Sequence, residues 1–288
     1  MIRLAVRVAA ADAELALAEL LVLSPAGVEE VEIAPGVIEY ALYGAAGELP
    51  TLPDLRAAAG SALVDVSTRE VADDWAQRWQ QFHTPVTVEG PSGARGDAAV
   101  HVRPPWAPAV AQTGVVDVVI DPGQAFGTGA HPSTRLCLEL LLEVASGGAA
   151  GGAAGDLVDV GCGSGVLAIA AACLGFSPVR ACDHDPLSVS ATVDNARAND
   201  VVLEVSRCDV RCQSPPPGTT MTANLLRPLL LDLLGVLDHP PRTLIAGGLL
   251  ASEADEVADA FGRVHGLHER GRRGDGEWAA LLLKRAPG

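Results

Sequence analysis

The sequence lacks the features that would place the protein in a membrane or direct it out of the cell. Its 288 residues contain no uninterrupted apolar run of the roughly 18 residues that a membrane-spanning helix requires. The chain does not start, at Met1 to Leu4, with the charged segment, apolar segment and cleavage site of a signal peptide. We therefore expect a soluble protein of the cytoplasm, long enough for two modest domains.

Recognisable metal ligands and covalent nucleophiles are also missing. None of the six cysteines belongs to a Cys-x-x-Cys pair, and the seven histidines form no cluster with metal-ligand spacing. The cysteines all lie between Cys137 and Cys212, and we interpret them as reduced core residues. No Ser-His-Asp or Cys-His arrangement stands out. The sequence therefore predicts no metal site and no dedicated nucleophile.

Positive charge is scarce. The chain has 20 Lys and Arg against 36 Asp and Glu, a net charge of -16, and Lys284 is its only lysine. A general phosphate-backbone binder needs a face rich in Lys and Arg, so we expect no direct binding of nucleic acid. The acidity suits a basic protein partner, although it also suits a role in solubility alone.

Residues 1–70 predict a small α+β domain. The apolar patterns alternate in the ferredoxin-like order strand, helix, strand, strand, helix, strand, over residues 2–8, 11–23, 28–33, 37–43, 54–59 and 62–67. We expect this domain to serve recognition or scaffolding, because none of its residues suggests chemistry. Residues 71–84 predict a linker helix, whose aromatic residues Trp75, Trp79 and Phe82 share one face and suit core packing. Residues 85–288 then form the larger domain.

A loop rich in glycine opens the chemically informative part of the chain. A β-branched strand is predicted at residues 115–120 and a helix at 136–144, and the loop between them contains Phe126, Gly127, Ser133 and Thr134. Such a loop can fold over a ligand, while hydroxyls and backbone N–H groups near the helix start can bind a carboxylate. An ordinary glycine-rich connection is the alternative.

Residues 157–172 predict a buried strand, a glycine turn and a helix. Gly161 and Gly163 allow the backbone to turn sharply and to approach a ligand closely. A dinucleotide-binding turn needs a glycine three places after Gly163, where this chain has Val166. The spacing from Asp159 to Gly165 therefore favours an adenosine that carries an amino acid, with S-adenosylmethionine as the obvious candidate. Turn chemistry without a ligand stays open.

Polar residues follow the next predicted strands. Asp183 ends the strand at residues 178–182 and lies 22 residues beyond Gly161, where an acid typically grips a ribose diol. Asp185 precedes Pro186 and is expected to cap a helix. Asn224 ends a further strand, at the edge where open α/β sheets bind ligands. Asp209 is a weaker candidate for the adenine edge, and the remaining strands are predicted at residues 201–205, 219–223, 243–246, 264–267 and 278–283.

Four motifs, in this order and spacing, resemble the PrmA family, the bacterial methyltransferases of large-subunit ribosomal protein eleven. They are Asp-Pro-Gly-x-Ala-Phe-Gly-Thr-Gly-x-His at 121–131, Asp-Val-Gly-Cys-Gly-Ser-Gly at 159–165, Asp-His-Asp-Pro at 183–186 and Ala-Asn-Leu-Leu at 223–226. The resemblance covers nearly the whole chain. It implies a class I S-adenosylmethionine-dependent methyltransferase, with a Rossmann-like, mostly parallel sheet of seven strands, behind a ferredoxin-like recognition domain.

The resemblance also implies roles for individual residues. Thr134, Gly161, Asp183 and Asn224 match the family's cofactor-binding positions, joined by Gly163 of the same turn. Phe126 and Gly127 belong to the loop over the methionine end.

The implied activity is methylation of lysine ε-amines, or of an N-terminal α-amine, in a large-subunit ribosomal protein. A neutral amine needs positioning and desolvation for this in-line displacement, and Asn224 can orient it through its hydrogens. A non-ribosomal protein substrate and a non-catalytic binding protein are the alternatives.

Overall fold

The computed structural model describes residues 2–10, 13, 16–17, 20, 29–34, 36–44, 49–70, 83–90, 98–122, 129–147 and 155–286. The chain divides into two compact units, Met1–Phe82 and His83–Gly288. Most of the predicted linker helix, residues 71–82, lies outside the described residues. Within the described ranges, no helix is long and apolar enough to cross a membrane.

The first unit is a four-stranded antiparallel sheet with strands in the order β2-β3-β1-β4. Its elements are β1 (Ile2–Ala9), β2 (Glu29–Ala34), β3 (Val37–Gly44), α2 (Leu52–Ala59) and β4 (Leu63–Glu70). Residues 13, 16, 17 and 20 are helical, and the Tyr40 hydroxyl donates to the Ala13 carbonyl at 3.0 Å. This strand order is ferredoxin-like, as the sequence predicts.

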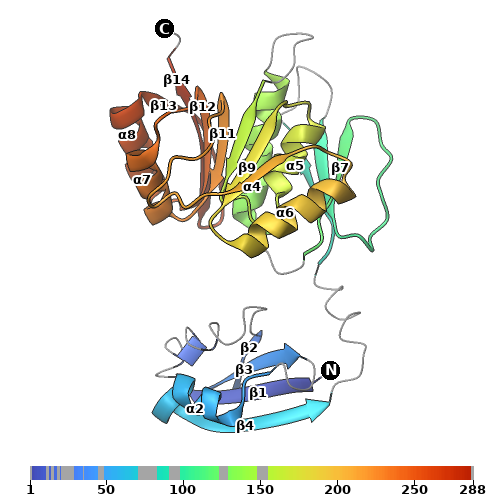
Figure 1. The fold of residues 1–288 in the computed structure, drawn as a ribbon, viewed down its shortest axis with the longest axis vertical. Helices are drawn as coiled ribbons and strands as arrows, with labels where there is room; N and C mark the ends of the chain where they lie inside the picture. Colours follow the sequence, from blue (N-terminus) through green and yellow to red (C-terminus); the bar gives the residue numbers. More distant parts are fainter. Residues whose placement is uncertain are drawn as a thin grey trace. The chain divides into compact units, whose positions relative to one another are not determined.

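The second unit contains a seven-stranded sheet (Figure 1). In spatial order its strands are β10 (Glu204–Arg207), β9 (Val179–Asp183), β8 (Leu157–Val160), β11 (Thr220–Asn224), β12 (Thr243–Leu250), β14 (Trp278–Arg285) and β13 (Leu267–Asp275). The first five run parallel, and β14 is antiparallel to both β12 and β13. The predicted class I methyltransferase fold, with its mostly parallel sheet, is confirmed.

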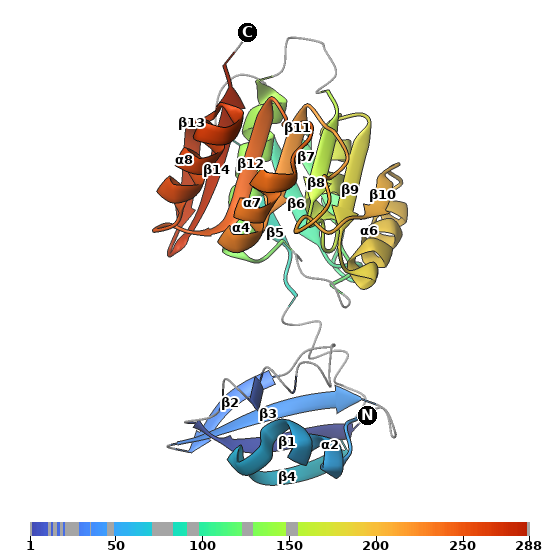
Figure 2. The same cartoon turned by 60° about the vertical axis from the view of Figure 1, so that its left-hand side comes forward.

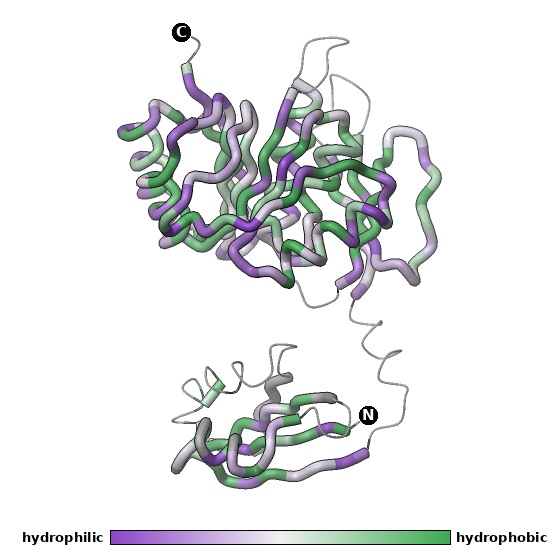
Figure 3. The backbone as a smooth tube through the Cα atoms, viewed as in Figure 1, coloured by the Kyte–Doolittle hydropathy of each residue, from purple (hydrophilic) through white to green (hydrophobic). Residues whose placement is uncertain are grey.

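Helices cover both faces of this sheet, as Figures 1 and 2 show. One face carries α4 (Pro132–Ser146), α5 (Val166–Cys173) and α6 (Pro186–Ala198), and the other carries α7 (Arg227–Val236) and α8 (Ala254–His265). Since β-strand side chains alternate between faces, Leu157 joins the first core while Val158 and Val160 join the second. Hydrophobic and hydrophilic segments alternate along α7 and α8 in Figure 3, which agrees with one buried face on each helix.

A separate three-stranded sheet packs against α4 and α5. It consists of β5 (Val86–Glu89), β6 (Ala99–Arg103) and β7 (Val115–Val119), with β5 antiparallel and β7 parallel to β6. Valines from all three strands, among them Val88, Val100 and Val118, join the core beneath α4. Just after β7, the Asp121 N–H donates to the Oδ1 of Asn195 on α6.

Several predicted boundaries are wrong, and three of them have a clear physical cause. Helix α4 begins at Pro132 and not at Leu136, because His131 caps it and proline suits the first helical position. Strand β10 starts at Glu204, since Val201 still bonds to the end of α6 through its N–H. The strand predicted at residues 264–267 begins only at Leu267, as β13, because α8 runs to His265 and ends at Gly266, whose φ of +66° reverses the chain.

Candidate functional site

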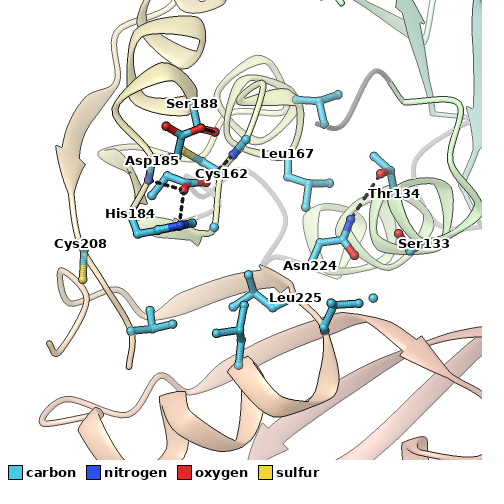
Figure 4. Close-up of a pocket in the computed structure, with 18 of the residues that line it drawn as sticks. Ser133, Thr134, Cys162, Leu167, His184, Asp185, Ser188, Cys208, Asn224 and Leu225 are labelled. Atoms are coloured by element: carbon cyan, nitrogen blue, oxygen red, sulfur yellow. Dashed lines mark hydrogen bonds and ion pairs between the residues drawn. The ribbon is translucent and has the colours of Figure 1, made fainter. Parts of the chain in front are cut away.

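A cavity of about 730 Å³ lies at the carboxyl ends of β8, β9 and β11, within the roughly 300 to 1,000 Å³ typical of small-molecule sites. Figure 4 shows Cys162, His184 and Asp185 on one side and Thr134 and Asn224 on the other. Gly161, Gly163 and Asp183 also line it. The predicted residues Phe126 and Gly127 lie outside the described part of the chain.

The glycine turn after β8 depends on left-handed backbone. Gly161, Gly163 and Gly165 have φ angles of +73°, +53° and +83°, which residues with a Cβ rarely adopt. A Cβ on Gly161 would stand 2.3 Å from the Cδ2 atom of Leu225. The Gly161 N–H donates to the Cys182 carbonyl at 2.8 Å. The turn is therefore fixed to β9 and leaves no room for a side chain at Gly161.

Asp183 occupies the end of β9 with its carboxylate held by backbone groups. Its Oδ2 accepts the Gly163 N–H and its Oδ1 accepts the Asp185 N–H, both at 3.0 Å. The Nδ1 atom of His184 lies 3.2 Å from Oδ1. Each carboxylate oxygen can accept a second hydrogen bond. Asp183 therefore presents oriented acceptor capacity to the cavity. Asp185 caps α6 by accepting the Leu187 N–H, as predicted.

Thr134 and Asn224 meet at the other side of the cavity. The Asn224 Nδ2 atom donates to the Thr134 hydroxyl at 3.3 Å, which fixes the orientation of the amide. The buried Asn224 Oδ1 accepts no hydrogen bond from any residue that the structure describes. A buried acceptor without a donor is costly in a native structure, so this oxygen is suited to accept an N–H from a ligand.

Sequence reasoning did not place Leu225 or Trp278 in the site. The Trp278 and His131 rings pack edge to face, with centroids 4.7 Å apart, and both line the cavity. Trp278 begins strand β14, which is far away in the sequence, so no local sequence pattern predicts that Trp278 belongs to the site. Leu225 is enclosed between glycines, because a Cβ on Gly248 would lie 2.6 Å from its carbonyl oxygen.

Asp209, the weaker candidate for the adenine edge, forms an ion pair within its own turn. Arg211 donates its Nε to Oδ1 at 2.8 Å and an NH2 to Oδ2 at 2.7 Å. These hydrogen bonds lower the pKa of Asp209 to about 2. Asp209 lines the cavity, but both oxygens of its carboxylate are already engaged by Arg211.

The cysteines agree with the interpretation as core residues, except at Cys173 and Cys212. Cys137, Cys162, Cys182 and Cys208 are buried, whereas Cys173 is half-buried and Cys212 exposed. Burial raises the pKa of the Cys137, Cys162 and Cys182 thiols. These three thiols are therefore poor nucleophiles at neutral pH.

Beneath the turn, Asp159 is a buried carboxyl. Its Oδ1 accepts the Thr222 hydroxyl at 2.6 Å. Burial raises the pKa of Asp159 to about 7, although the Thr222 hydroxyl favours the charged form. Asp159 therefore holds a proton in the folded protein at pH values where an unfolded chain has released it.

This raised pKa predicts a pH dependence of stability. Between about pH 4 and pH 7 the unfolded state binds fewer protons at this site, so the unfolding free energy falls as pH rises through that window. Between about pH 4 and pH 7, we expect the unfolding free energy of the natural protein to fall by about 2 to 4 kcal/mol more than that of Asp159→Asn, whose side chain cannot titrate. Urea unfolding of both proteins at several pH values measures the difference. Parallel pH profiles would contradict the expectation.

The family model described as "Ribosomal protein L11 methyltransferase (PrmA)" matches residues 40–286. The chain belongs to the PrmA family. A relative named ribosomal protein L11 methyltransferase, from Heliobacterium modesticaldum, is 35% identical over 219 residues, which are 74% of this chain and 65% of that relative. Another of that name, from Bordetella parapertussis, is 40% identical over 207 residues, 68% of this chain and 62% of the relative.

A solved PrmA-family structure shares the fold. The crystal structure of ribosomal protein L11 methylase from Lactobacillus delbrueckii subsp. bulgaricus is 26% identical and matches with a TM-score of 0.55, over 65% of this chain and 94% of that chain. The first curated relative matches over 65% of its own length, so the alignment spans about two thirds of that protein.

Proposed function

We propose that this PrmA-family protein binds S-adenosylmethionine in the cavity and transfers its methyl group to amino groups of a large-subunit ribosomal protein. One observation carries the proposal. On one side of the cavity the Asp183 carboxylate is oriented by the glycine turn at Gly161–Gly165. On the other side is Asn224, whose buried amide oxygen lacks a hydrogen-bond donor among the residues that the structure describes. The first arrangement suits an adenosyl group and the second suits an amine.

The cavity residues fit an adenosine that carries an amino acid. Asp183 can accept a hydrogen bond from a ribose hydroxyl at Oδ2, where only the Gly163 N–H is bound, whereas Oδ1 already contacts the Asp185 N–H and the His184 Nδ1. Gly161 and Gly163 allow close approach of the backbone. We propose that Thr134, with its hydroxyl held by Asn224, lies at the methionine end. Phe126 and Gly127 are proposed, from the family resemblance alone, to belong to the loop over that end.

We propose that Asn224 orients the attacking amine. When bound, S-adenosylmethionine would supply a sulfonium methyl group, whose carbon a neutral amine would attack in line while the carbon–sulfur bond breaks and the thioether leaves. Asn224 Oδ1 would accept one amine N–H, and the bond from its Nδ2 to the Thr134 hydroxyl fixes the plane of the amide. Leu225 and Trp278 exclude water from the same side. These residues position and desolvate the amine, which are effects that contribute greatly to such reactions.

The substrate proposal depends on relatives and on charge. The relatives described above carry the name ribosomal protein L11 methyltransferase, and a net charge of -16 favours a basic partner. We propose that residues 1–70 recognise this partner, that residues 71–84 form the linker and that residues 85–288 carry the chemistry. A non-ribosomal substrate is the alternative that keeps the chemistry.

Two measurements test the proposal. Calorimetry should detect binding of S-adenosylmethionine, and the absence of binding at high micromolar cofactor would exclude the enzymatic function. With labelled cofactor, the protein should methylate a large-subunit ribosomal protein taken from a strain that lacks this gene, at lysine or the N-terminus by mass mapping. Label confined to a non-ribosomal protein would overturn the substrate and retain the chemistry.

A further inference from the structure

Helix α6 carries three polar side chains that bond to the backbone of other segments. Thr192 and Asn195 lie one turn apart on α6, and Asn199, which caps its C-terminus, follows one turn later on the same side. Thr192 is fully buried and Asn195 is 3% exposed. Buried polar groups must find hydrogen-bond partners. Thr192 and Asn195 find them in the glycine turn, and Asn195 and the half-buried Asn199 find them at or just after the end of β7.

Asn195 contacts both loops at once. Its Nδ2 atom donates to the Ser164 carbonyl at 2.9 Å, in the glycine turn. Its Oδ1 atom accepts the Asp121 N–H at 2.9 Å, where the chain leaves β7. A carboxamide is a donor and an acceptor in one rigid plane. Asn195 therefore fixes the distance between the glycine turn and the start of the segment that leads to α4.

Its two neighbours each contact one loop only. The Thr192 hydroxyl donates to the Gly163 carbonyl at 3.0 Å. The Asn199 amide accepts the Val119 N–H at 2.7 Å and donates to the Val119 carbonyl at 2.6 Å. Thr192 therefore holds the glycine turn and Asn199 holds the end of β7, whereas Asn195 joins the two.

We propose that Asn195 is a positioning residue that couples the cofactor turn to the segment beginning at Asp121; this inference rests on the proposed function. The Gly163 N–H holds the Asp183 carboxylate, so a displaced turn also displaces the group assigned to the ribose. The segment from Asp121 ends at His131, which caps α4 and lines the cavity. A shift of about 1 Å in such a group can lower a rate by about 100-fold.

Three variants of α6 separate the contributions. Asn195→Asp keeps an acceptor for the Asp121 N–H but directs a carboxylate oxygen at the Ser164 carbonyl. Thr192→Val removes only the bond to the glycine turn and preserves the shape of the side chain. Asn199→Asp makes the same chemical change as Asn195→Asp one turn later on the helix, away from the glycine turn.

The readouts are the Kd for S-adenosylhomocysteine by calorimetry, the kcat for methyl transfer and the Tm. We expect Asn195→Asp to weaken binding and to lower kcat, each by about tenfold or more. Thr192→Val should weaken binding with kcat nearly unchanged, and Asn199→Asp should lower kcat while Kd stays within about twofold. Should Asn195→Asp fail to fold, Asn195→Ala removes both bonds without a buried charge and is judged by the same criteria.

Two outcomes would overturn the proposal. One is an Asn195 variant that binds the ligand and turns over as the natural protein does. The other is a pair of Asn195 and Asn199 variants that change Kd, kcat and Tm in the same proportion, because that pattern reflects helix stability alone. If the natural protein binds no S-adenosylhomocysteine, the proposed function fails instead, so the two failures are distinguishable.

Discussion

Replacing Asp183 with alanine is expected to weaken the binding of S-adenosylmethionine by about 5- to 150-fold, equal to about 1 to 3 kcal/mol. The variant removes the charged acceptor proposed for the ribose hydroxyls. It also leaves the N–H groups of Gly163 and Asp185 without the partner that orders them in the structure. Titration calorimetry of the variant and the natural protein measures the loss.

Asp194→Ala provides the matched control. Asp194 lies on α6 and pairs with Arg197 at 2.7 Å, with both side chains largely exposed, so it does not touch the cavity. Its loss should leave cofactor affinity unchanged, since exposed ion pairs contribute little. If Asp183→Ala bound the cofactor as tightly as Asp194→Ala, the assignment of Asp183 to the ribose would be wrong.

Gly161→Ala is expected to destabilise the protein by about 2 to 4 kcal/mol, which combines left-handed backbone strain with overpacking. Gly161 has a φ of +73°, and a Cβ there would stand 2.3 Å from Leu225. The methyl group would also push the Leu225 side chain, which lines the cavity. Urea unfolding measures the stability, and calorimetry the accompanying loss of cofactor binding.

A second glycine separates these two terms. Gly266 has a similar φ of +66°, but a Cβ there would meet nothing within 4 Å. Gly266→Ala should therefore show only the backbone strain, about 1 to 2 kcal/mol. If both variants lost the same unfolding free energy, the Leu225 side chain would have moved aside without an energetic penalty, and the steric argument for the glycine turn would be mistaken.

Local patterns predicted the parts of the site that short-range chemistry determines. The glycine turn requires positive φ angles, and Asp185 before Pro186 caps α6 as expected. Asp183 and Asn224 follow strands whose ends must meet at one edge of a parallel sheet. The loop pattern pointed to Ser133 or Thr134 at the helix start, and the family resemblance singled out Thr134.

Contacts between residues far apart in the chain could not be predicted from the sequence. Trp278 reaches the cavity only because β14 lies beside β12, a pairing that no local pattern specifies. Asn195 looks like an ordinary helix residue until its bonds to Ser164 and Asp121 are known. The strand predicted at residues 264–267 lies further along the chain, at Leu267–Asp275, because Val264, 61% exposed, belongs to the last turn of an amphipathic helix.

The enclosure of Leu225 between two glycines has a consequence for redesign of the acceptor range. Leu225 lies close to both glycines, since a Cβ on Gly161 would meet its side chain and a Cβ on Gly248 its backbone, so an exchange at Leu225 also affects the glycine turn. Its neighbour Leu226 lines the same cavity but is 61% exposed. A mutant library for new amines should therefore randomise Leu226 and keep Leu225 fixed. The exposed part of the cavity lining is then varied while the glycine turn stays intact.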